Sequence, residues 1–388
     1  MSNSKPSFKK KKSEPQQYWS GLPKDILRLI LEKLPWSERL RLSLVRKTWK
    51  ECFHEIKNAQ EFLPWLMFYN WDKCRGCRDE NHGNSICKLA DPFVQKRFTV
   101  EEATKGTERD FFFYAEPCAS SHGWVLFSRV ICEMKHLFLY SPFTNEVIRF
   151  PGLEIGFSDM ASFYLNPASS DFTVIAFSIL VAGKLEIGTC HPGDESWKKF
   201  EFCGDYDFIC DVGYADESFY CSLSNGKLGA FNIKQQEWKL LWNLQSELSP
   251  LVYLYAFNGD LIMGLGDCNP RSLPCALWRF DLLERKWVVV ENEIIEKMVI
   301  FRDRTSSLSF SVPAEGNARE SAGKIHYLFC KRGTPWSRSF NCVGSSWIES
   351  PNYEWMEADS LTRIWIQPPL QRIFRASDLL QSGSGKIR

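Results

Sequence analysis

Three observations predict a mainly β chain with a small α-helical module near its N-terminus. Apolar residues follow a clear helical spacing within residues 19–60, and elsewhere such patterns are scarce, with residues 283–298 as the main ambiguous stretch. Short runs of Val, Ile, Phe and Tyr alternate with turn residues over most of the remaining chain, which is typical of strands. Hydrophobic residues make up 44% of the 388 residues and aromatic residues 14%, which suits packed sheets and excludes a chain without a core.

Two apolar stripes define the helical module. The first comprises Leu27, Ile30, Leu31 and Leu34, and the second comprises Leu42, Val45, Trp49 and Phe53. Pro23 suits the first turn of a helix, and Pro35 stops that helix. Two or three short helices in about forty residues make a poor independent core. The stripes therefore pack either on a partner or on the rest of the chain, and their periodicity leaves both possibilities open.

A degenerate repeat runs through the β part. Four segments consist of an apolar strand, a polar turn and a second strand, and they span residues 137–151, 187–202, 228–242 and 277–291. The equivalent positions Val147, Trp197, Trp238 and Trp287 are spaced by 50, 41 and 49 residues. Such a period matches one four-stranded blade of a β-propeller, and the available length allows about four to six blades. A β-sandwich or an open array of hairpins is the alternative.

The sequence divides into four parts. Residues 1–17 are predicted to be a disordered lysine-rich tail, residues 18–60 the helical module, residues 61–370 the propeller, and residues 371–388 a flexible C-terminal tail. The run Lys9 to Lys12 reads either as a nuclear import signal or as a solubilising tail. Asn225-Gly226 and Asn258-Gly259 predict tight hairpins within the propeller.

Charge and cysteine usage limit the function classes. Residues 1–60 carry a net charge of +8, which leaves −7 of the chain's +1 on residues 61–388. A nucleic-acid partner is unlikely to fit so acidic a large domain. We expect no membrane span, because no run of 18 apolar residues occurs. The 14 scattered cysteines and the absence of an apolar leader indicate reduced thiols in the nucleus, the cytoplasm or both.

The helical module resembles an F-box. The segment 22–52 reads LPKDILRLILEKLPWSERLRLSLVRKTWKEC. The family pattern has two Leu-Pro pairs, a Leu-rich second helix, and then Val, a basic residue and Trp. The matching residues here are Leu22-Pro23, Leu34-Pro35, Leu40 to Leu44, Val45, Lys47 and Trp49. Arg46 departs from the pattern, because many members have Cys there.

This resemblance implies docking to the Skp-type adaptor of a cullin-based SCF ubiquitin ligase through the apolar helix faces. The residues expected to bind the adaptor are Leu22, Pro23, Ile26, Leu27, Ile30, Leu31, Leu34, Pro35, Leu42, Val45 and Trp49. The adaptor is acidic in this family, which fits the net charge of +4 on residues 19–60. Through the adaptor, a cullin is the second expected partner.

The β part resembles the degenerate kelch-like propeller domain of plant F-box proteins. Its typical phrases are read here as PWLM at 64–67, GWVL at 123–126, LYSPFT at 139–144 and, loosely, IHYLF at 325–329. Ser141 stands for the usual Asn, and the final repeat is weak. The resemblance implies a substrate receptor whose propeller recruits an unknown protein for ubiquitination. No cofactor is expected, although some F-box receptors use a small molecule.

One cysteine cluster has the spacing of a zinc knuckle. Cys74, Cys77, His82 and Cys87 form a C-x2-C-x4-H-x4-C pattern. The surrounding segment lacks the aromatic residues that a knuckle uses for nucleic acid, and it follows a strand as a hairpin loop would. We therefore predict a polar loop with incidental thiols and no metal, with zinc binding as the alternative.

No catalytic motif stands out. The chain has no P-loop, no GxGxxG after a strand, no GxSxG and no HExxH, and its six His residues are dispersed. The trio Asp205, Asp207 and Asp211 is predicted to be an exposed acidic loop, with a metal site as the alternative. We expect no enzyme. A propeller enzyme with a helical cap, a non-SCF interaction scaffold and a nucleic-acid binder are the competing hypotheses.

Overall fold

The structure is a computed structural model and divides into two compact units, residues 1–58 and residues 59–388. It describes residues 22–34, 36–43, 45–55, 63–70, 86–91, 96–100, 112–154, 156, 158–166, 172–181, 183–224, 227–243, 251–266, 277–281, 283–302, 308–331, 334–341, 346–349, 362–369 and 374–383. The predicted N-terminal tail, residues 1–17, lies outside these ranges. The domain boundary between the units falls at 58, against the predicted boundary at 60.

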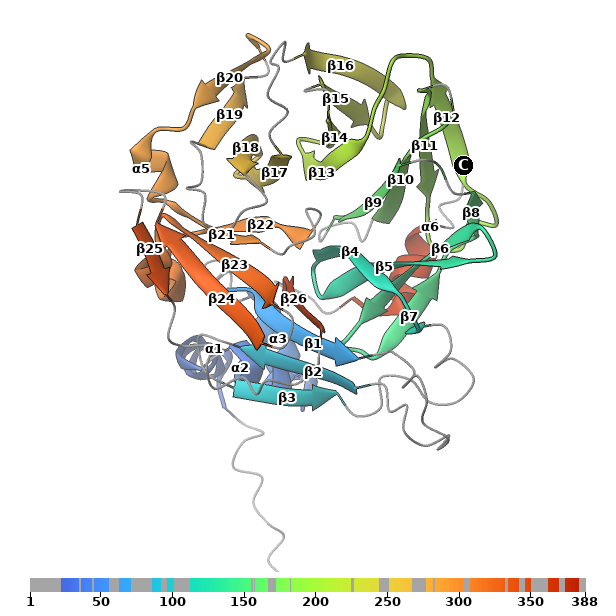
Figure 1. The fold of residues 1–388 in the computed structure, drawn as a ribbon. Coiled ribbons are helices and arrows are strands. Elements are labelled where there is room, and N and C mark those ends of the chain that lie inside the picture. The colour runs from blue at the N-terminus through green and yellow to red at the C-terminus, as the bar shows by residue number, and fades with distance from the viewer. Residues whose placement is uncertain are drawn as a thin grey trace, which may run out of the picture. The chain divides into compact units, whose positions relative to one another are not determined.

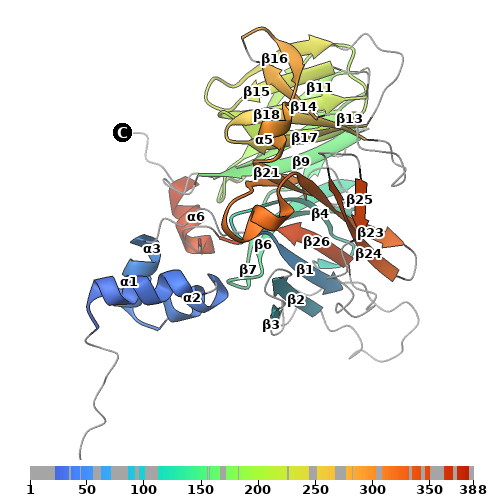
Figure 2. The ribbon, with the colours of Figure 1, turned by 90° about the vertical axis from the view of Figure 1, so that its left-hand side faces the viewer.

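The smaller unit consists of three helices, α1 (Lys24–Lys33), α2 (Trp36–Ser43) and α3 (Lys47–Glu55) (Figure 2). The carbonyl of Pro23 accepts the N–H of Leu27 at 3.1 Å, so the first turn of α1 begins at the proline as expected. Helix α3 packs against both α1 and α2. The second apolar stripe of the sequence is divided between α2 and α3, because Val45 lies in the turn that joins them.

The larger unit is a six-bladed β-propeller (Figure 1). The first blade contains β26 (Thr362–Ile366), β1 (Trp65–Asn70), β2 (Ile86–Asp91) and β3 (Lys96–Val100). The second contains β4 (Glu116–Ser121), β5 (Trp124–Ile131), β6 (Met134–Ser141) and β7 (Glu146–Arg149), with β8 (Leu153–Glu154) also paired to β6. The third contains β9 (Ser158–Leu165), β10 (Phe172–Ile179), β11 (Leu185–Cys190) and β12 (Lys198–Phe202).

The remaining blades follow in chain order. The fourth contains β13 (Ile209–Ala215), β14 (Ser218–Leu223), β15 (Lys227–Asn232) and β16 (Glu237–Asn243). The fifth contains β17 (Leu251–Phe257), β18 (Asp260–Gly266), β19 (Leu277–Asp281) and β20 (Lys286–Val289). The sixth contains β22 (Phe310–Pro313), β21 (Met298–Arg302), β23 (Lys324–Lys331), β24 (Thr334–Asn341) and β25 (Ser346–Glu349).

The propeller prediction is confirmed, and six blades is the upper end of the expected range. Three of the four aligned repeat positions are tryptophans, and all three are partly buried. Each lies in the outermost strand of its blade or directly before it. The indole N–H of Trp197 donates to the carbonyl of Pro151 at 2.8 Å, which ties the third blade to the second. The indole N–H of Trp238 donates to the Tyr206 hydroxyl at 3.0 Å. In both cases the indole joins the outermost part of a blade to the connection that enters that blade from the preceding one.

Ring closure uses strands from far apart in the sequence. Strand β26 pairs antiparallel with β1, so the first blade takes its inner strand from near residue 365. The sixth blade is irregular, since β21 and β23 are parallel neighbours. The chain returns from β22 to β23 through a 3-10 helix, Gly316–Ser321, and enters β21 through the short helix α5 (Asn292–Ile295).

The two ends of the blades differ. We call the end with the turns between first and second strands the turn face, and the end with the blade-to-blade connections and the turns between second and third strands the connection face. The turn-face residues His122-Gly123, Asp216-Glu217 and Asn258-Gly259 all have positive φ, as two-residue hairpins require. The Asn258-Gly259 hairpin is thus confirmed, whereas Asn225-Gly226 lies outside the described residues.

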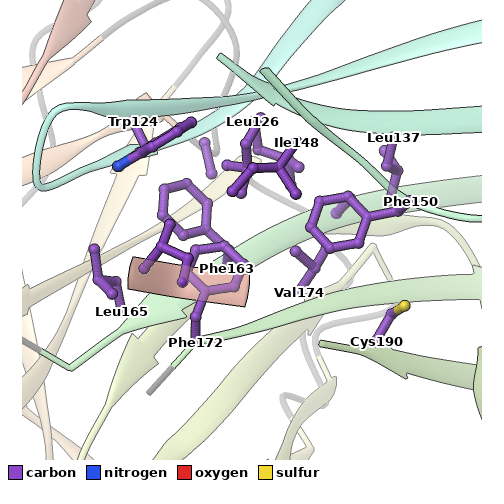
Figure 3. Close-up of a cluster of buried hydrophobic side chains, with 14 of the residues drawn as sticks. Trp124, Leu126, Leu137, Ile148, Phe150, Phe163, Leu165, Phe172, Val174 and Cys190 are labelled. Carbon is purple, nitrogen blue, oxygen red and sulfur yellow. The ribbon is translucent and has the colours of Figure 1, made fainter. Parts of the chain in front are cut away.

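A large apolar cluster fills the seam between the second and third blades (Figure 3). Phe163 and Phe172 lie 5.2 Å apart between ring centroids, and Phe150 stacks on Phe172 at 6.5 Å. Two residues from beyond the last strand complete this cluster, namely the fully buried Phe374 and Leu379. The seam is therefore closed by a segment that the strand pattern does not include.

The prediction of a flexible tail is wrong for residues 374–383. Helix α6 (Ala376–Gly383) packs against β7 and β10. A carboxylate oxygen of Glu146 accepts the N–H of Ala376 at 2.9 Å, and Arg375 pairs with Glu146 at 3.7 Å. The error arises because the apolar pair Phe374 and Leu379 finds its partners in blades that lie 184 to 260 residues earlier in the sequence. None of the described helices is long and apolar enough to cross a membrane.

Candidate adaptor interface

Helix α1 has two apolar sides with different surroundings. Leu27 and Leu31 are buried, and Leu31 is 0% exposed. Ile26 and Leu29 are exposed, at 43% and 55%. With 100° between successive residues, Ile26 and Leu29 share one side of the helix, and Leu27 and Leu31 share another. One side belongs to the core of the molecule, and the other presents large aliphatic groups to solvent.

Helix α3 supplies the partner side of the helical core. Trp49, Cys52 and Phe53 are buried. The Cys52 thiol lies 3.8 Å from the carbonyl of Lys24 at the start of α1. This packing uses the spacing of four between Trp49 and Phe53, which places both on one side of α3. The core side chains of so small a unit are few, so each of them carries a large share of its stability.

Ion pairs join α1 to α3 at the surface. Lys24 lies 3.0 Å from Glu51, and Arg28 lies 3.2 Å from Glu55. The hydrogen bond with Lys24 holds the pKa of the Glu51 carboxyl below its usual value, and the same bond raises the pKa of Lys24. Exposed pairs of this kind contribute little stability. Lys24 and Arg28 lie on the side of α1 opposite Ile26, so the ion pairs leave the side that carries Ile26 uncovered.

A buried arginine closes the connection between α1 and α2. The Arg39 guanidinium donates to the carbonyl of Leu34 at 2.7 Å and to that of Glu32 at 3.3 Å. These are carbonyls of the last turn of α1, which have no partner inside the helix. A cation at this end also interacts favourably with the helix dipole. Arg39 is therefore a structural residue, although sequence patterning places a basic residue there on the surface.

The predicted adaptor-binding residues fall into distinct groups. The buried ones are Leu27, Leu31 and Trp49, the partly buried ones are Leu22, Ile30, Leu34 and Leu42, the exposed ones are Pro23, Ile26 and Val45, and Pro35 lies outside the described residues. The buried group holds the helices together, so the exposed group carries the prediction of adaptor contact. That contact itself stays a prediction.

Leu29 is the surface residue that sequence reasoning missed. It lies three residues after Ile26, so it shares that exposed side. A single stripe with the spacing i, i+3, i+4 omits Leu29. The apolar residues of α1 extend over about 200° of the helix circumference, because they serve two surfaces. The departure from the family pattern, Arg46, is exposed. Exposed basic residues around the aliphatic groups are Lys33, Arg46, Lys47 and Lys50.

The zinc alternative can be examined at one of its four residues. Cys74, Cys77 and His82 lie outside the described residues. Cys87 lies in β2 and is buried, and burial raises the pKa of its thiol to about 12. Tyr140 is its hydrogen-bond partner. A thiolate ligand is disfavoured in such surroundings. Among the described residues, no three His, Cys, Asp or Glu side chains are grouped for metal binding.

The acidic trio is split by the structure. Asp205 and Asp207 are exposed, as predicted. The prediction is wrong for Asp211, which is fully buried. Its carboxylate accepts the N–H of Val212 and the N–H of Leu254, each at 2.8 Å. Because Leu254 belongs to β17, this carboxylate joins the fourth blade to the fifth. Asp205 and Asp207 differ from Asp211 because they lie in the loop before β13, whereas Asp211 lies within that strand.

One group of side chains has the order of a nucleophile, a base and an acid. The Thr173 hydroxyl lies 3.2 Å from Nε2 of His191, and Nδ1 of His191 lies 3.4 Å from Asp194. Thr173 is buried within β10. A nucleophile must be reached by its substrate, so this group stabilises the turn after β11. It gives the enzyme hypothesis no support.

Comparisons with known families agree with this architecture. The F-box domain model matches residues 19–58, and the KIB1-4 beta-propeller model matches residues 76–321, more than half of the chain. The F-box/kelch-repeat protein At1g57790 of Arabidopsis thaliana is 22% identical over 90% of this chain and 95% of its own length. The F-box protein At3g56470 of the same plant is 23% identical over 93% of this chain and 91% of its own.

Solved structures resemble the chain more remotely. TolB from Acinetobacter baumannii is 10% identical, aligns with 81% of this chain and 69% of its own, and has a TM-score of 0.43. Such a likeness carries nothing about function. The family models and the plant relatives together give the classification: the chain belongs to the KIB1-4 β-propeller family and carries an F-box domain before its propeller.

Proposed function

We propose that the chain is the substrate-receptor subunit of an SCF-type cullin ubiquitin ligase. The observation that carries the proposal is the exposure of three large aliphatic side chains of the F-box, Ile26 and Leu29 on one side of α1 and Val45 in the turn before α3. A unit with few core residues that leaves three large aliphatic groups in water has a surface suited to a partner. The partner is the Skp-type adaptor that F-box domains bind.

The charges around this surface support an acidic adaptor. Lys33, Arg46, Lys47 and Lys50 are exposed. Lys24 and Arg28, by contrast, are already paired with Glu51 and Glu55. These four exposed cations outnumber the exposed carboxylate Asp25 in the first turn of α1, so the F-box surface is net basic. Such an arrangement steers an acidic partner and fixes its orientation, while apolar burial supplies most of the affinity.

The propeller recruits a protein substrate, and the chain performs no bond chemistry itself. Tethering raises the concentration of the substrate near the conjugating enzyme. In the triad-like set, the Thr173 hydroxyl that would be the nucleophile is buried, whereas His191 and Asp194 are partly exposed. The receptor acts in the nucleus, the cytoplasm or both, as the lysine run Lys9 to Lys12 and the scattered cysteines led us to expect.

Reconstitution tests this function directly. Purified full-length chain, Skp-type adaptor and cullin are mixed in pairs and together, and their complexes are separated by gel filtration. We expect the chain to co-migrate with the cullin only when the adaptor is present. A folded chain that never co-migrates with the adaptor would contradict the proposal and would favour the propeller-enzyme or non-SCF scaffold hypotheses.

A further inference from the structure

Exposed apolar side chains of the propeller gather on the connection face. Those in or beside its described loops are Tyr114, Val130, Val181 and Phe208. They belong to consecutive blades, because Tyr114 precedes β4, Val130 ends β5, Val181 follows β10 and Phe208 precedes β13. In the described turns of the turn face, Leu283 is the corresponding exposed residue. The two faces therefore differ in apolar character, and the connection face is the richer.

Val181 and Phe208 lie in loops that are joined to each other, and Val181 is the most exposed of the four residues. Val181 is 92% exposed and Phe208 is 48% exposed. Their loops are joined by a backbone hydrogen bond, in which the N–H of Tyr206 donates to the carbonyl of Gly183 at 3.1 Å. A second bond runs from the N–H of Ser224 to the carbonyl of Phe208 at 2.8 Å. Three loops of two blades are thus held as one surface.

The turn that carries Val181 is closely packed beneath. Gly183 has a φ of +69°, and a Cβ there would lie 3.4 Å from the carbonyl oxygens of Gly204 and Tyr206. Only glycine adopts this conformation at little cost while a neighbouring backbone approaches so closely. The Tyr206 hydroxyl is in turn held by the Trp238 indole at 3.0 Å. A surface with this support is preorganised, which lowers the entropy cost of binding.

Carboxylates are exposed in the loops of the same face. Asp205 and Asp207 are exposed beside Phe208, and Glu133 is exposed in the turn of the neighbouring second blade. The cations of the same loops are engaged locally, because Lys184 pairs with Glu201 at 4.0 Å and Lys227 donates to the carbonyl of Asp205. The surface is therefore apolar with an acidic border, in agreement with the net charge of −7 on residues 61–388.

We infer that the loops around Val181 and Phe208 are the docking surface for the substrate, and that it takes a peptide segment with an apolar side chain flanked by lysine or arginine. The apolar side chain covers Val181 and Phe208, and the cations approach Asp205 and Asp207. Calling the bound protein a substrate rests on the proposed function. The chemistry of the surface rests on the exposed groups alone.

A displayed library of random peptides, selected on the full-length chain, provides the probe. We expect enrichment of sequences that place Lys or Arg beside Phe, Leu, Ile or Trp. A fluorescein-labelled synthetic copy of the most enriched peptide is then titrated against the chain by anisotropy. The double variant Val181→Ser/Phe208→Ser should weaken its binding roughly tenfold or more. The double variant Asp205→Asn/Asp207→Asn should weaken binding at low salt and reduce its salt dependence.

The matched control is Leu283→Ser, which removes a 95% exposed leucine from the other face and should leave binding unchanged. Three results would overturn the inference: no enrichment, enrichment of acidic peptides, or equal binding by the Val181→Ser/Phe208→Ser variant. A dimer of the wild type that this variant dissociates would assign the surface to a second copy of the chain and would also overturn it. Adaptor binding is measured on the same preparations, so a chain that binds the peptide without binding the adaptor contradicts only the ligase role.

Discussion

The F-box unit and the propeller differ in how they use their apolar residues. In the propeller, the largest apolar side chains are fully buried, among them Trp124, Trp365 and Phe177. In the F-box unit, α1 buries Leu31 and exposes Leu29, although both are leucines two residues apart. The propeller closes on itself through β26, so these large side chains serve its own core. The helical unit has too few residues to do so, and its exposed side serves a partner.

The largest expected effect is the difference in stability between variants of Leu31 and Leu29 in α1. Leu31→Asp places an uncompensated charge at a fully buried position and should cost about 3 kcal/mol or more, enough to unfold the helical unit. Leu29→Asp lies at an exposed position and should leave the unit folded. Amide hydrogen exchange in α1 and α3 measures this difference. Loss of protection in both variants would show that Leu29 belongs to the core.

The C-terminal helix tests which residues belong to the propeller. Leu379→Ala removes a fully buried side chain from the cluster between the second and third blades and should lower the free energy of unfolding by about 2–4 kcal/mol. Leu380→Ala is the matched control, because Leu380 is exposed on the same helix. Denaturant unfolding followed by tryptophan fluorescence measures both. Equal unfolding midpoints for the two variants would show that residues 374–383 do not contribute to the propeller core.

A buried histidine gives the propeller a pH dependence. Burial, with a smaller effect of Lys324, lowers the pKa of His326 to about 3. The unfolded chain binds a proton near pH 6.5 that the folded chain does not, so stability falls as pH decreases from about 6.5 towards 3. At pH 5 the loss should be about 2 kcal/mol.

The variant His326→Leu should reduce this decline, and thermal unfolding between pH 7 and pH 5 measures it. His122 retains a contribution of about the same size over this pH range in the variant, because burial lowers its pKa to about 4. Identical pH profiles for wild type and variant would contradict the assignment of the decline to His326.

The smallest expected effect concerns the exposed ion pairs of the F-box. Glu51→Gln removes the partner of Lys24, and both side chains are exposed. Because water screens such pairs, hydrogen-exchange protection of α1 should stay close to that of the wild type. A large loss of protection would mean that the ion pairs, and not Leu27 and Leu31, hold α1 to α3.

The sequence predicted those elements whose signals are local. Pro23 and the spacing of Leu27 and Leu31 placed α1, and the recurring tryptophans at 197, 238 and 287 placed outer blade strands. Asn258-Gly259 placed a hairpin because both residues tolerate positive φ.

Non-local features were missed for a common reason. The sixth blade pairs β21 with β23 in parallel, the first blade contains β26, and Leu379 packs into a cluster whose blade residues lie 189 to 260 positions earlier. None of these contacts has a periodic signal in the sequence. The division of α1 into a core side and a partner side was missed likewise, because periodicity shows that a residue is apolar and does not show what covers it.

The most direct test of the central claim is the affinity of the full-length chain for purified Skp-type adaptor, measured by calorimetry for three proteins. The wild type should bind, and Leu29→Asp should bind at least about tenfold more weakly while its helices keep their exchange protection. The control Val130→Ser, which changes an exposed aliphatic residue of the propeller, should bind like the wild type. Equal affinities for wild type and a folded Leu29→Asp variant would contradict the account of the F-box surface.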